Sequence, residues 1–336
     1  LIVVLADDMG VTDIGAFHEL YPGATEEQLA HRYTPNLDRL AKEGVRCTRA
    51  YAASWCAPSR QMLLSGLWVN RRDAYDRPWI GSQLRQEGYV TGLVGKSHGG
   101  RPIAKTYRNM DPNTAEVDDG FFFNGGCRRS YLEKGETFPG RRGLKPFIFT
   151  AKGGEYLTDV YTDHAVDFIE RSADRPFMLY LPYNAPHTPL FVPERYARPY
   201  FEQGLPERTA LVYGMIASID ENVGRLLDRL DALDLARNTI VIFLSDNGPI
   251  WGWSEISPVR FNAGLRGQKF TVFEGGIRVP FFIRWPGRLE AGLQIGEPAA
   301  HIDVLPTLLD YCSLAAPADV HIDGVSLRPL LEEGPD

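Results

Sequence analysis

The chain begins with Leu1-Ile2-Val3-Val4-Leu5, a continuous apolar run that passes directly into Ala6-Asp7-Asp8. Short runs rich in β-branched residues are typical of strands that are buried on both faces of a parallel sheet. Three later segments follow the same plan, with an apolar strand that leads into polar, ligand-type residues: residues 90–94 before Lys96 and His98, residues 177–181 before His187, and residues 239–244 before Asp246 and Asn247.

Between these predicted strands, amphipathic patterns over residues 34–43, 158–171 and 207–233 predict helices. Alternating strands and helices indicate an α/β fold with a largely parallel sheet. Ligands bind such sheets at the carboxyl ends of the strands, which lie along one edge. We therefore expect the four polar clusters to meet at that edge, although they are far apart in the sequence.

The composition limits the classes of function. With 336 residues, the chain is long enough for one large α/β domain or two smaller ones. A net charge of −7 argues against nonspecific binding to nucleic acids or to membrane surfaces. No apolar run approaches the ~20 residues needed to span a bilayer. If one of the four cysteines is catalytic, the other three cannot all pair within the chain, which favours a reducing compartment or buried thiols.

Two pairs of oxygen-bearing side chains follow the first and the last of these strands. Asp7-Asp8 and Asp246-Asn247 supply three carboxylates and an amide, and such hard ligands favour Ca²⁺ or Mg²⁺. Adjacent carboxylates repel each other unless a cation lies between them. Each pair alone is explained as well by a turn, in which Asp7 is a cap and Asp246-Asn247-Gly248 is tightly folded. Two such pairs at two buried strand ends favour a metal site.

The stretch Cys56-Ala57-Pro58-Ser59-Arg60 predicts the start of a helix, because proline is favoured in the first helical turn. The backbone N–H groups of that turn and the helix dipole attract an anion. Arg60 follows Cys56 by four residues, so both lie on one face if the helix begins early enough. This stretch therefore predicts an anion-binding site.

Several basic side chains are candidates for neutralising the charge of such an anion or for transferring protons. Lys96 and His98 share one face of an extended segment, where lysine neutralises charge and histidine shuttles protons near neutral pH. His187 lies between two prolines, which predicts a rigid extended loop. Lys269 precedes a glycine-rich turn, although a lone lysine is usually just solvated. A lone histidine is more often structural than catalytic, and we place five in that class: His18, His31, His164, His301 and His321.

The segment from Cys56 to Arg60 resembles the signature of the type I sulfatases, a family of the alkaline phosphatase superfamily. Further collinear segments are similar to motifs of that family: residues 5–10, 95–98, 185–187, 245–248, 273–280 and 301–307. The resemblance implies an alkaline-phosphatase-like α/β fold, with a mostly parallel central sheet flanked by helices on both faces. It implies a sulfatase catalytic domain over residues 1–315, with a long insertion or loop region over residues 99–154. Residues 316–336 would then begin a linker to a C-terminal subdomain that is missing from this chain.

The same resemblance implies a chemistry. In this family, a formylglycine-generating enzyme oxidises the cysteine at position 56 to formylglycine, and the hydrated aldehyde attacks a sulfate ester. The ester, of a small molecule or a carbohydrate, is hydrolysed to an alcohol and sulfate. The implied metal is Ca²⁺, with Mg²⁺ as the second choice, held by Asp7, Asp8, Asp246, Asn247 and residue 56.

The resemblance also implies roles for individual side chains. Arg60, Lys96 and Lys269 would neutralise charge on the bound sulfate. Asp246 would act as the base for the attacking hydroxyl group. His187, together with Lys269, would protonate the leaving alcohol, and His98 would take a proton in the step that releases sulfate.

Two other functions are compatible with these residues. A phosphonate monoester or phosphodiester hydrolase uses the same aldehyde and metal, and phosphate and sulfate esters share a tetrahedral shape. An anion-binding protein would leave Cys56 unconverted, but binding alone needs neither His98 nor His187. We rank the sulfatase first. We expect no nucleic-acid partner and no membrane span, and a bacterial cytoplasm or periplasm as the compartment.

Overall fold

The computed structural model describes residues 1–21, 33–71, 80–96, 155–250, 260, 262–316 and 321–334, and the backbone of residues 119–123, 137–139 and 148–150. The four predicted strands are present as β1 (Ile2–Ala6), β4 (Val90–Lys96), β8 (Phe177–Pro182) and β9 (Val241–Ser245). They lie side by side in the order β9-β1-β8-β4, and every pair of neighbours is parallel. All their residues are buried, which explains their continuous apolar character.

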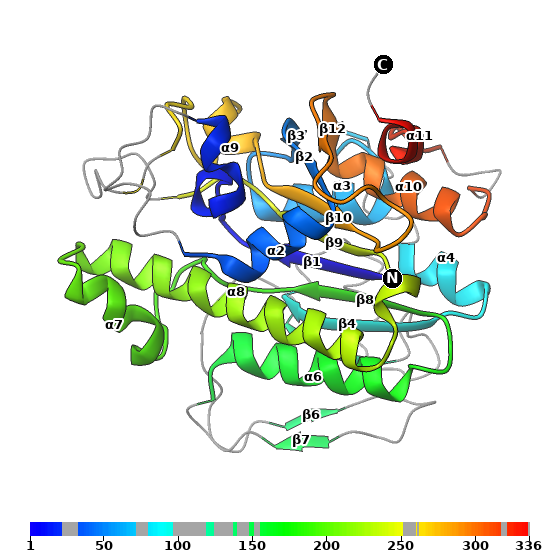
Figure 1. Cartoon of the computed structure of the whole chain (residues 1–336), viewed down its shortest axis with the longest axis horizontal. Coiled ribbons are helices and arrows are strands. Elements are labelled where there is room, and N and C mark those ends of the chain that lie inside the picture. Colours follow the sequence, from blue (N-terminus) through cyan, green and yellow to red (C-terminus); the bar gives the residue numbers. More distant parts are fainter. Residues whose placement is uncertain are drawn as a thin grey trace.

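Shorter strands extend this core on both sides. β10 (Phe281–Arg284) runs antiparallel to β9 and to β2 (Val45–Cys47), and β11 (Gln294–Ile295) runs parallel to β2. On the other side, β5 (Asp119–Phe123) runs parallel to β4. The complete eight-stranded sheet has the order β11-β2-β10-β9-β1-β8-β4-β5. Figure 1 labels its central part, from β2 through β10, β9, β1 and β8 to β4. These outer strands were not predicted, because runs this short carry little periodicity.

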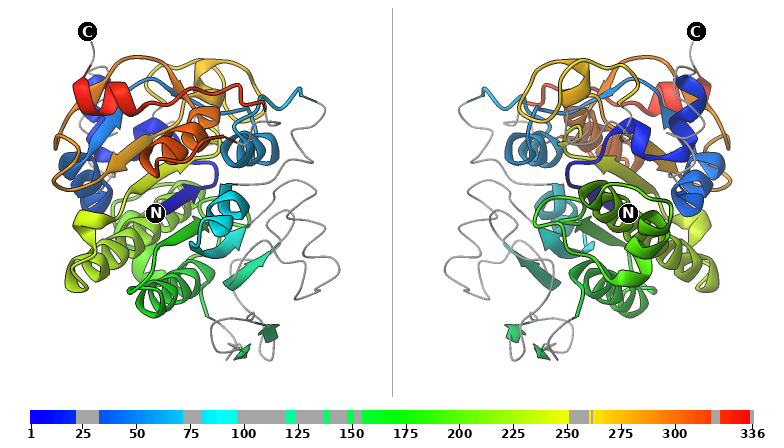
Figure 2. Two further views of the ribbon diagram at one scale, coloured as in Figure 1. Left: turned by 90° about the vertical axis from the view of Figure 1, so that its right-hand side faces the viewer. Right: turned by 90° about the vertical axis from the view of Figure 1, so that its left-hand side faces the viewer.

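Helices cover both faces of the sheet (Figure 2). Successive side chains of a strand point to opposite faces, so Ile2 and Val4 enter one hydrophobic core, and Val3 and Leu5 enter another. The first core is closed by the three predicted helices, now α2 (Pro35–Glu43), α6 (Leu157–Arg171) and α8 (Glu207–Ala232). The second is closed by α3 (Cys56–Ser65), α4 (Ile80–Gln86), α10 (Val304–Tyr311) and α11 (Arg328–Glu333). The expected fold class is therefore confirmed.

Smaller elements complete the described part of the chain. α7 (Glu194–Glu202) packs along α8, and α9 (Glu274–Ile277) is a single turn. Short 3₁₀ helices are η1 (Val11–Asp13), η2 (Gly15–Leu20), η3 (Ala236–Asn238) and η4 (His301–Asp303). Two further small sheets pair β3 (Ala50–Tyr51) with β12 (Ala299–Ala300), and β6 (Thr137–Pro139) with β7 (Ile148–Thr150).

Residues 321–334 differ from the linker expected there. Leu327 and Leu331 are buried in the second core, and the backbone N–H of Asp323 donates to the carbonyl of Gly66 at 2.9 Å. This segment is thus part of the domain. Apart from β5, β6 and β7, the expected insertion over residues 99–154 lies outside the described residues. Among the helices that the structure does describe, none combines the length and the apolar character that a bilayer crossing requires.

Candidate active site

The predicted clusters meet at the carboxyl ends of the central strands. Asp7 and Asp8 follow β1, and Asp246 and Asn247 follow its parallel neighbour β9. The backbone N–H of Asp8 donates to Oδ1 of Asp246 at 3.2 Å, and Nδ2 of Asn247 donates to Oδ1 of Asp8 at 2.7 Å. Lys96, the last residue of β4, forms an ion pair with Oδ2 of Asp7. The expected convergence of these residues is therefore confirmed.

The helix α3 carries Cys56 and Arg60 into this cluster. It begins at Cys56, so Pro58 lies in its first turn and Arg60 comes one turn after the cysteine. The guanidinium of Arg60 is completely buried, with Nε 2.9 Å from Oδ2 of Asp246 and Nη2 3.0 Å from Oδ2 of Asp7. Ligand atoms of Cys56, Asp7 and Asp246 lie within 4.8 Å of one another. The predicted pairing of Cys56 and Arg60 on one helix face holds.

Asp8 anchors a second part of the site. Nζ of Lys269 lies 2.5 Å from Oδ1 of Asp8, and Nε2 of His187 lies 3.9 Å from Oδ2. Nδ1 of His187 lies 2.6 Å from the carbonyl oxygen of Thr188. A carbonyl only accepts, so Nδ1 carries a proton and Nε2 faces Asp8. The loop of His187 is a turn, closed by its backbone N–H and the carbonyl of Asn184 at 3.1 Å, and not the extended segment that we expected.

The charges of the site are matched. Three buried carboxylates face three buried cations: Asp7, Asp8, Asp246, Arg60, Lys96 and Lys269. Burial opposes ionisation of Asp7, but Lys96 and Arg60 outweigh it and hold the pKa of Asp7 well below its usual range. Burial, together with the charge of Asp7, raises the pKa of Asp246 to about 6. Burial and the nearby carboxylates also raise the pKa of the Cys56 thiol.

The acidic residues fit a hard divalent cation. Oδ1 of Asp7 and Oδ1 of Asn247 are buried and have no hydrogen-bond partner. A buried polar atom without a partner is costly, and a bound cation would satisfy both oxygens. Asp7 also belongs to two groups of closely spaced ligand atoms, one with Asp8 and His187 and one with Cys56 and Asp246. Carboxylate and amide oxygens suit Ca²⁺ or Mg²⁺.

Two buried residues support the site and were not recognised in the sequence as supports. Arg260 donates to both carboxylate oxygens of Asp13, at 3.0 and 2.6 Å, and to the backbone carbonyl of Asp8 at 3.4 Å. Asp8 has a φ of 69°, a left-handed conformation that is uncommon for a residue with a side chain, and Arg260 therefore holds a strained segment. Arg260 and Asp13 lie 247 residues apart in the sequence, so no local sequence pattern reveals their ion pair.

His301 is the second support. Its Nδ1 lies 3.2 Å from the carbonyl of Ser59 in α3, and its Nε2 lies 3.1 Å from the carbonyl of Ser245 at the end of β9. The imidazole thus joins the helix of Cys56 and Arg60 to the strand that leads into Asp246. The expectation of a structural histidine at 301 is confirmed, although the sequence did not show what it joins.

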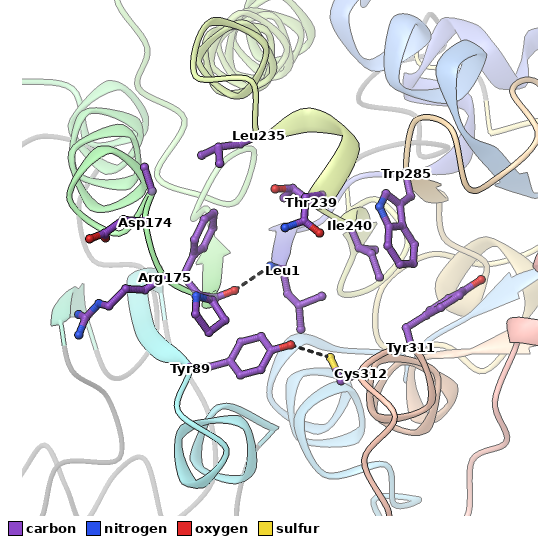
Figure 3. Close-up of a pocket in the computed structure, with 14 residues that line it drawn as sticks. Leu1, Tyr89, Asp174, Arg175, Leu235, Thr239, Ile240, Trp285, Tyr311 and Cys312 are labelled. Atoms are coloured by element: carbon purple, nitrogen blue, oxygen red, sulfur yellow. Dashed lines mark hydrogen bonds between the residues drawn. The ribbon is translucent and has the colours of Figure 1, made fainter.

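Other features lie apart from this cluster. His98, one of the predicted catalytic residues, lies outside the described residues. A cavity of about 410 Å³ lies at the opposite, amino end of the sheet, where Leu1, Phe177 and Ile240 line it together with Trp285 and Tyr311 (Figure 3). None of the predicted site residues lines this cavity.

The comparisons with known proteins agree on a family. A family model named Sulfatase matches residues 1–314. The chain is 33% identical to N-acetylgalactosamine-6-sulfatase of Canis lupus familiaris, over 99% of this chain and 66% of that protein. It is 30% identical to the uncharacterized sulfatase YdeN of Escherichia coli (strain K12), over 91% of this chain and 58% of the relative.

A solved structure shares the fold of this chain. The crystal structure of Ps i-CgsB in complex with k-i-k-neocarrahexaose matches with a TM-score of 0.81 and 27% identity, covering 100% of this chain and 76% of that one. The chain spans about two thirds or less of the length of the two curated relatives. The match of the family model over nearly the whole chain shows that this protein belongs to the sulfatase family.

Proposed function

We propose that this protein hydrolyses a sulfate ester to an alcohol and sulfate, with a formylglycine derived from Cys56 as nucleophile and a bound Ca²⁺. The observation that carries the proposal is the position of Cys56. It is the first residue of a helix and lies with Asp7 and Asp246 in one group of ligand atoms, beside Arg60. A helix start next to buried cations and candidate metal ligands is suited to an anionic substrate.

The state of the thiol supports a modified nucleophile. Burial and the charges of Asp246 and Asp7 raise the pKa of Cys56, so an unmodified side chain stays protonated near neutral pH. A protonated thiol is a poor nucleophile. Formylglycine at this position would instead supply a hydrated aldehyde, with one hydroxyl group for attack and another for release of the product.

The charge balance supports a metal together with an anion. Three carboxylates and three cations nearly cancel, so the bare cluster has little net attraction for a sulfate ester. Asp7, Asp8, Asp246 and Asn247 would hold the cation, which adds two positive charges. Bound Ca²⁺ would supply Lewis-acid polarisation of the sulfuryl group. Arg60 and Lys96 then orient and neutralise the anion from the side of Asp7.

Proton transfer is assigned to the groups that surround Asp8. His187 and Lys269 reach its two oxygens and are placed to protonate the leaving alcohol. Asp246, whose pKa burial raises to about 6, is the base for the attacking hydroxyl group. His98 is assigned the proton of the release step from the sequence motif alone.

The experiment that tests this function starts from protein made together with a formylglycine-generating enzyme. The mass of the tryptic peptide over residues 50–60 shows whether Cys56 has become an aldehyde. We expect the aldehyde, and we expect Cys56→Ala to abolish sulfate-ester turnover with unchanged thermal unfolding. Cys47→Ala, at another buried cysteine, is the matched control and should remain active. Near-wild-type turnover in Cys56→Ala would overturn the mechanism. Parallel assays with aryl sulfate and aryl phosphonate esters separate the sulfatase from the phosphonate hydrolase.

A further inference from the structure

Two loops at the carboxyl edge of the sheet carry the four proposed metal ligands. Asp7 and Asp8 directly follow β1, and Asp246 and Asn247 directly follow its parallel neighbour β9. A cation that binds side chains of both loops requires the loops to keep a fixed relative position. Metal affinity therefore depends on the groups that hold the ligands in place as well as on the ligands themselves. A side chain that joins the two loops is a candidate for such a group.

The buried guanidinium of Arg260 contacts both loops. On the loop after β1, Nε and Nη2 donate to the two carboxylate oxygens of Asp13 at 3.0 and 2.6 Å, and Nη2 also donates to the carbonyl of Asp8 at 3.4 Å. On the loop after β9, Nη1 donates to the carbonyl of Ile250 at 3.0 Å. A guanidinium is planar and presents its N–H groups in fixed directions. These contacts therefore hold the two loops in one relative orientation.

Asp13 connects this guanidinium to the residues next to Asp8. Oδ2 of Asp13 accepts the backbone N–H of Gly10 at 2.8 Å, and the backbone N–H of Asp13 donates to the carbonyl of Gly10 at 3.1 Å. The segment from Asp8 to Asp13 is thus closed on itself by two hydrogen bonds. Arg260 contacts this segment at both of its ends, at the Asp8 carbonyl and at the Asp13 carboxylate.

The conformation of Asp8 shows what such a contact achieves. In its left-handed conformation, with a φ of 69°, its Oδ1 accepts from Asn247 and Lys269 at 2.7 and 2.5 Å. Its backbone N–H donates to Oδ1 of Asp246 at 3.2 Å. Rotation to the commoner negative φ would turn the carboxylate and the carbonyl of Asp8 together, away from these partners. Because Arg260 holds the carbonyl, it opposes this rotation.

We propose that Arg260 is a positioning residue of the metal site, which joins the two loops and holds Asp8 and Asp246 in the arrangement that binds Ca²⁺. The inference rests on the proposed function, which supplies the metal. Stability alone does not call for the charged pair, because replacing both partners of a buried ion pair by uncharged residues is often nearly neutral. Apolar residues in its place would leave out the contacts to both loops, and these contacts favour a role in the geometry of the site.

The test measures Ca²⁺ binding to metal-free protein by isothermal titration calorimetry, without any turnover. It compares the wild type with Arg260→Met and with Arg260→Met/Asp13→Asn. We expect the Kd for Ca²⁺ to rise about 10- to 100-fold in both variants. The double variant leaves no charge without a partner, so its stability should recover relative to Arg260→Met. A weak affinity that persists after stability has recovered separates positioning from stability.

A control and a second variant complete the comparison. Arg284 is also buried and pairs with Glu43 at 2.7 Å, but it lies opposite Val241, at the end of β9 away from the site. Arg284→Met should lower stability and leave the Kd for Ca²⁺ unchanged. Arg260→Lys serves if Arg260→Met does not fold. It keeps a charge beside Asp13, but a single ammonium does not reproduce the guanidinium contacts to both loops, so its Kd should also rise.

Hydrogen–deuterium exchange of the metal-free proteins tests the link between the loops without the metal. The backbone N–H groups of Asp8 and Gly10 donate to Asp246 and Asp13, which protects them from exchange while the loops stay together. We expect peptides over residues 6–13 to exchange faster in Arg260→Met/Asp13→Asn than in the wild type. Arg284→Met should exchange like the wild type in this segment.

Three outcomes would overturn the inference while the proposed function stands. The first is a wild type that binds Ca²⁺ with a Kd that both Arg260 variants share. The second is a Kd that rises in Arg260→Met and returns to the wild-type value in the double variant, which would assign the loss to the unpaired Asp13. The third is an equal rise in Arg284→Met, which would assign it to general destabilisation.

A wild type that binds no Ca²⁺ would instead remove the metal from the proposed function. Exchange over residues 6–13 that still depends on Arg260 would then keep its role in holding the loops. Exchange that does not depend on Arg260 would remove that role as well.

Discussion

Nε2 of His187 lies 3.9 Å from Oδ2 of Asp8, and the opposite ring nitrogen is held by the carbonyl of Thr188. The Thr188 contact fixes the ring, so the nitrogen that faces Asp8 is Nε2. A histidine held in this way is suited to deliver a proton to one defined position. This geometry is compatible with the role of proton donor that we propose for His187.

The proposed role of His187 as general acid predicts that the effect of its loss depends on the leaving group. His187→Asn should slow hydrolysis of an alkyl sulfate on the order of 10²-fold or more. The loss on 4-nitrophenyl sulfate should be much smaller, because a nitrophenolate leaves with little need for a proton. Steady-state kinetics on both esters measure the difference. Equal losses of rate on the two esters would mean that His187 acts only by its charge. If Lys269→Met loses rate selectively on the alkyl sulfate, the proton is assigned to Lys269.

The sequence was sufficient to predict the central strands and the convergence of their polar ends. β1 and β9 are buried on both faces, so their apolar runs are continuous, and parallel neighbours bring Asp7 and Asp246 to one edge by necessity. β2 and β11 were not predictable, because three and two residues show no periodicity. The antiparallel direction of β10 relative to β9 also depends on tertiary pairing rather than on a local sequence pattern.

The supports of the site lie beyond sequence reasoning for a different reason. Arg260 and Asp13 have no distinctive neighbours, and only the fold brings them together. The strain at Asp8 and Phe270 is equally invisible, because a positive φ at a residue with a side chain runs against the local preference. Such sites, where local preference and structure disagree, are expected near function.

Metal binding should stabilise the folded protein. Asp7 and Asn247 each hold a buried oxygen without a partner, which a cation would satisfy. At a Ca²⁺ concentration 100-fold above Kd, we expect the free energy of unfolding to rise by about 2.7 kcal/mol. Urea unfolding of metal-free protein, with and without Ca²⁺, measures this rise, and Mg²⁺ provides the comparison for selectivity.

Two matched variants test whether the stabilisation by Ca²⁺ arises at the candidate metal site. Asp246→Asn keeps the shape of the side chain but removes a charged ligand, so most of the stabilisation by Ca²⁺ should disappear. Asp163→Asn removes a carboxylate that is 62% exposed and pairs with Arg225 on the surface, and this variant should respond like the wild type. If Ca²⁺ stabilises Asp246→Asn as much as the wild type, the metal lies elsewhere.

The buried pair of Arg260 and Asp13 should contribute strongly to stability. Both side chains are almost completely buried, and Arg260→Met leaves the Asp13 charge without its partner. Breaking such a pair costs about 3–5 kcal/mol of unfolding free energy. In the double variant Arg260→Met/Asp13→Asn no charge is stranded, and the new amide oxygen still accepts from the backbone N–H of Gly10. The double variant should therefore be more stable than Arg260→Met. Chemical denaturation of all three proteins checks this order, and a double variant less stable than the single one would contradict it.

His301 should make stability depend on pH in the acidic range. Burial lowers its pKa from 6.5 to about 4 in the folded state, although the carbonyls of Ser59 and Ser245 favour the charged ring, because a neutral ring donates to only one of them. Above pH 6.5 the ring is neutral in both states. Between pH 6.5 and about 4, the ring binds a proton in the unfolded chain but stays neutral in the folded chain. Stability should thus fall as pH drops, by about 2 kcal/mol between pH 6.5 and 5. Urea unfolding of the wild type minus that of His301→Gln isolates this slope from other groups. A slope of the opposite sign would mean that a charged imidazolium donates to both carbonyls.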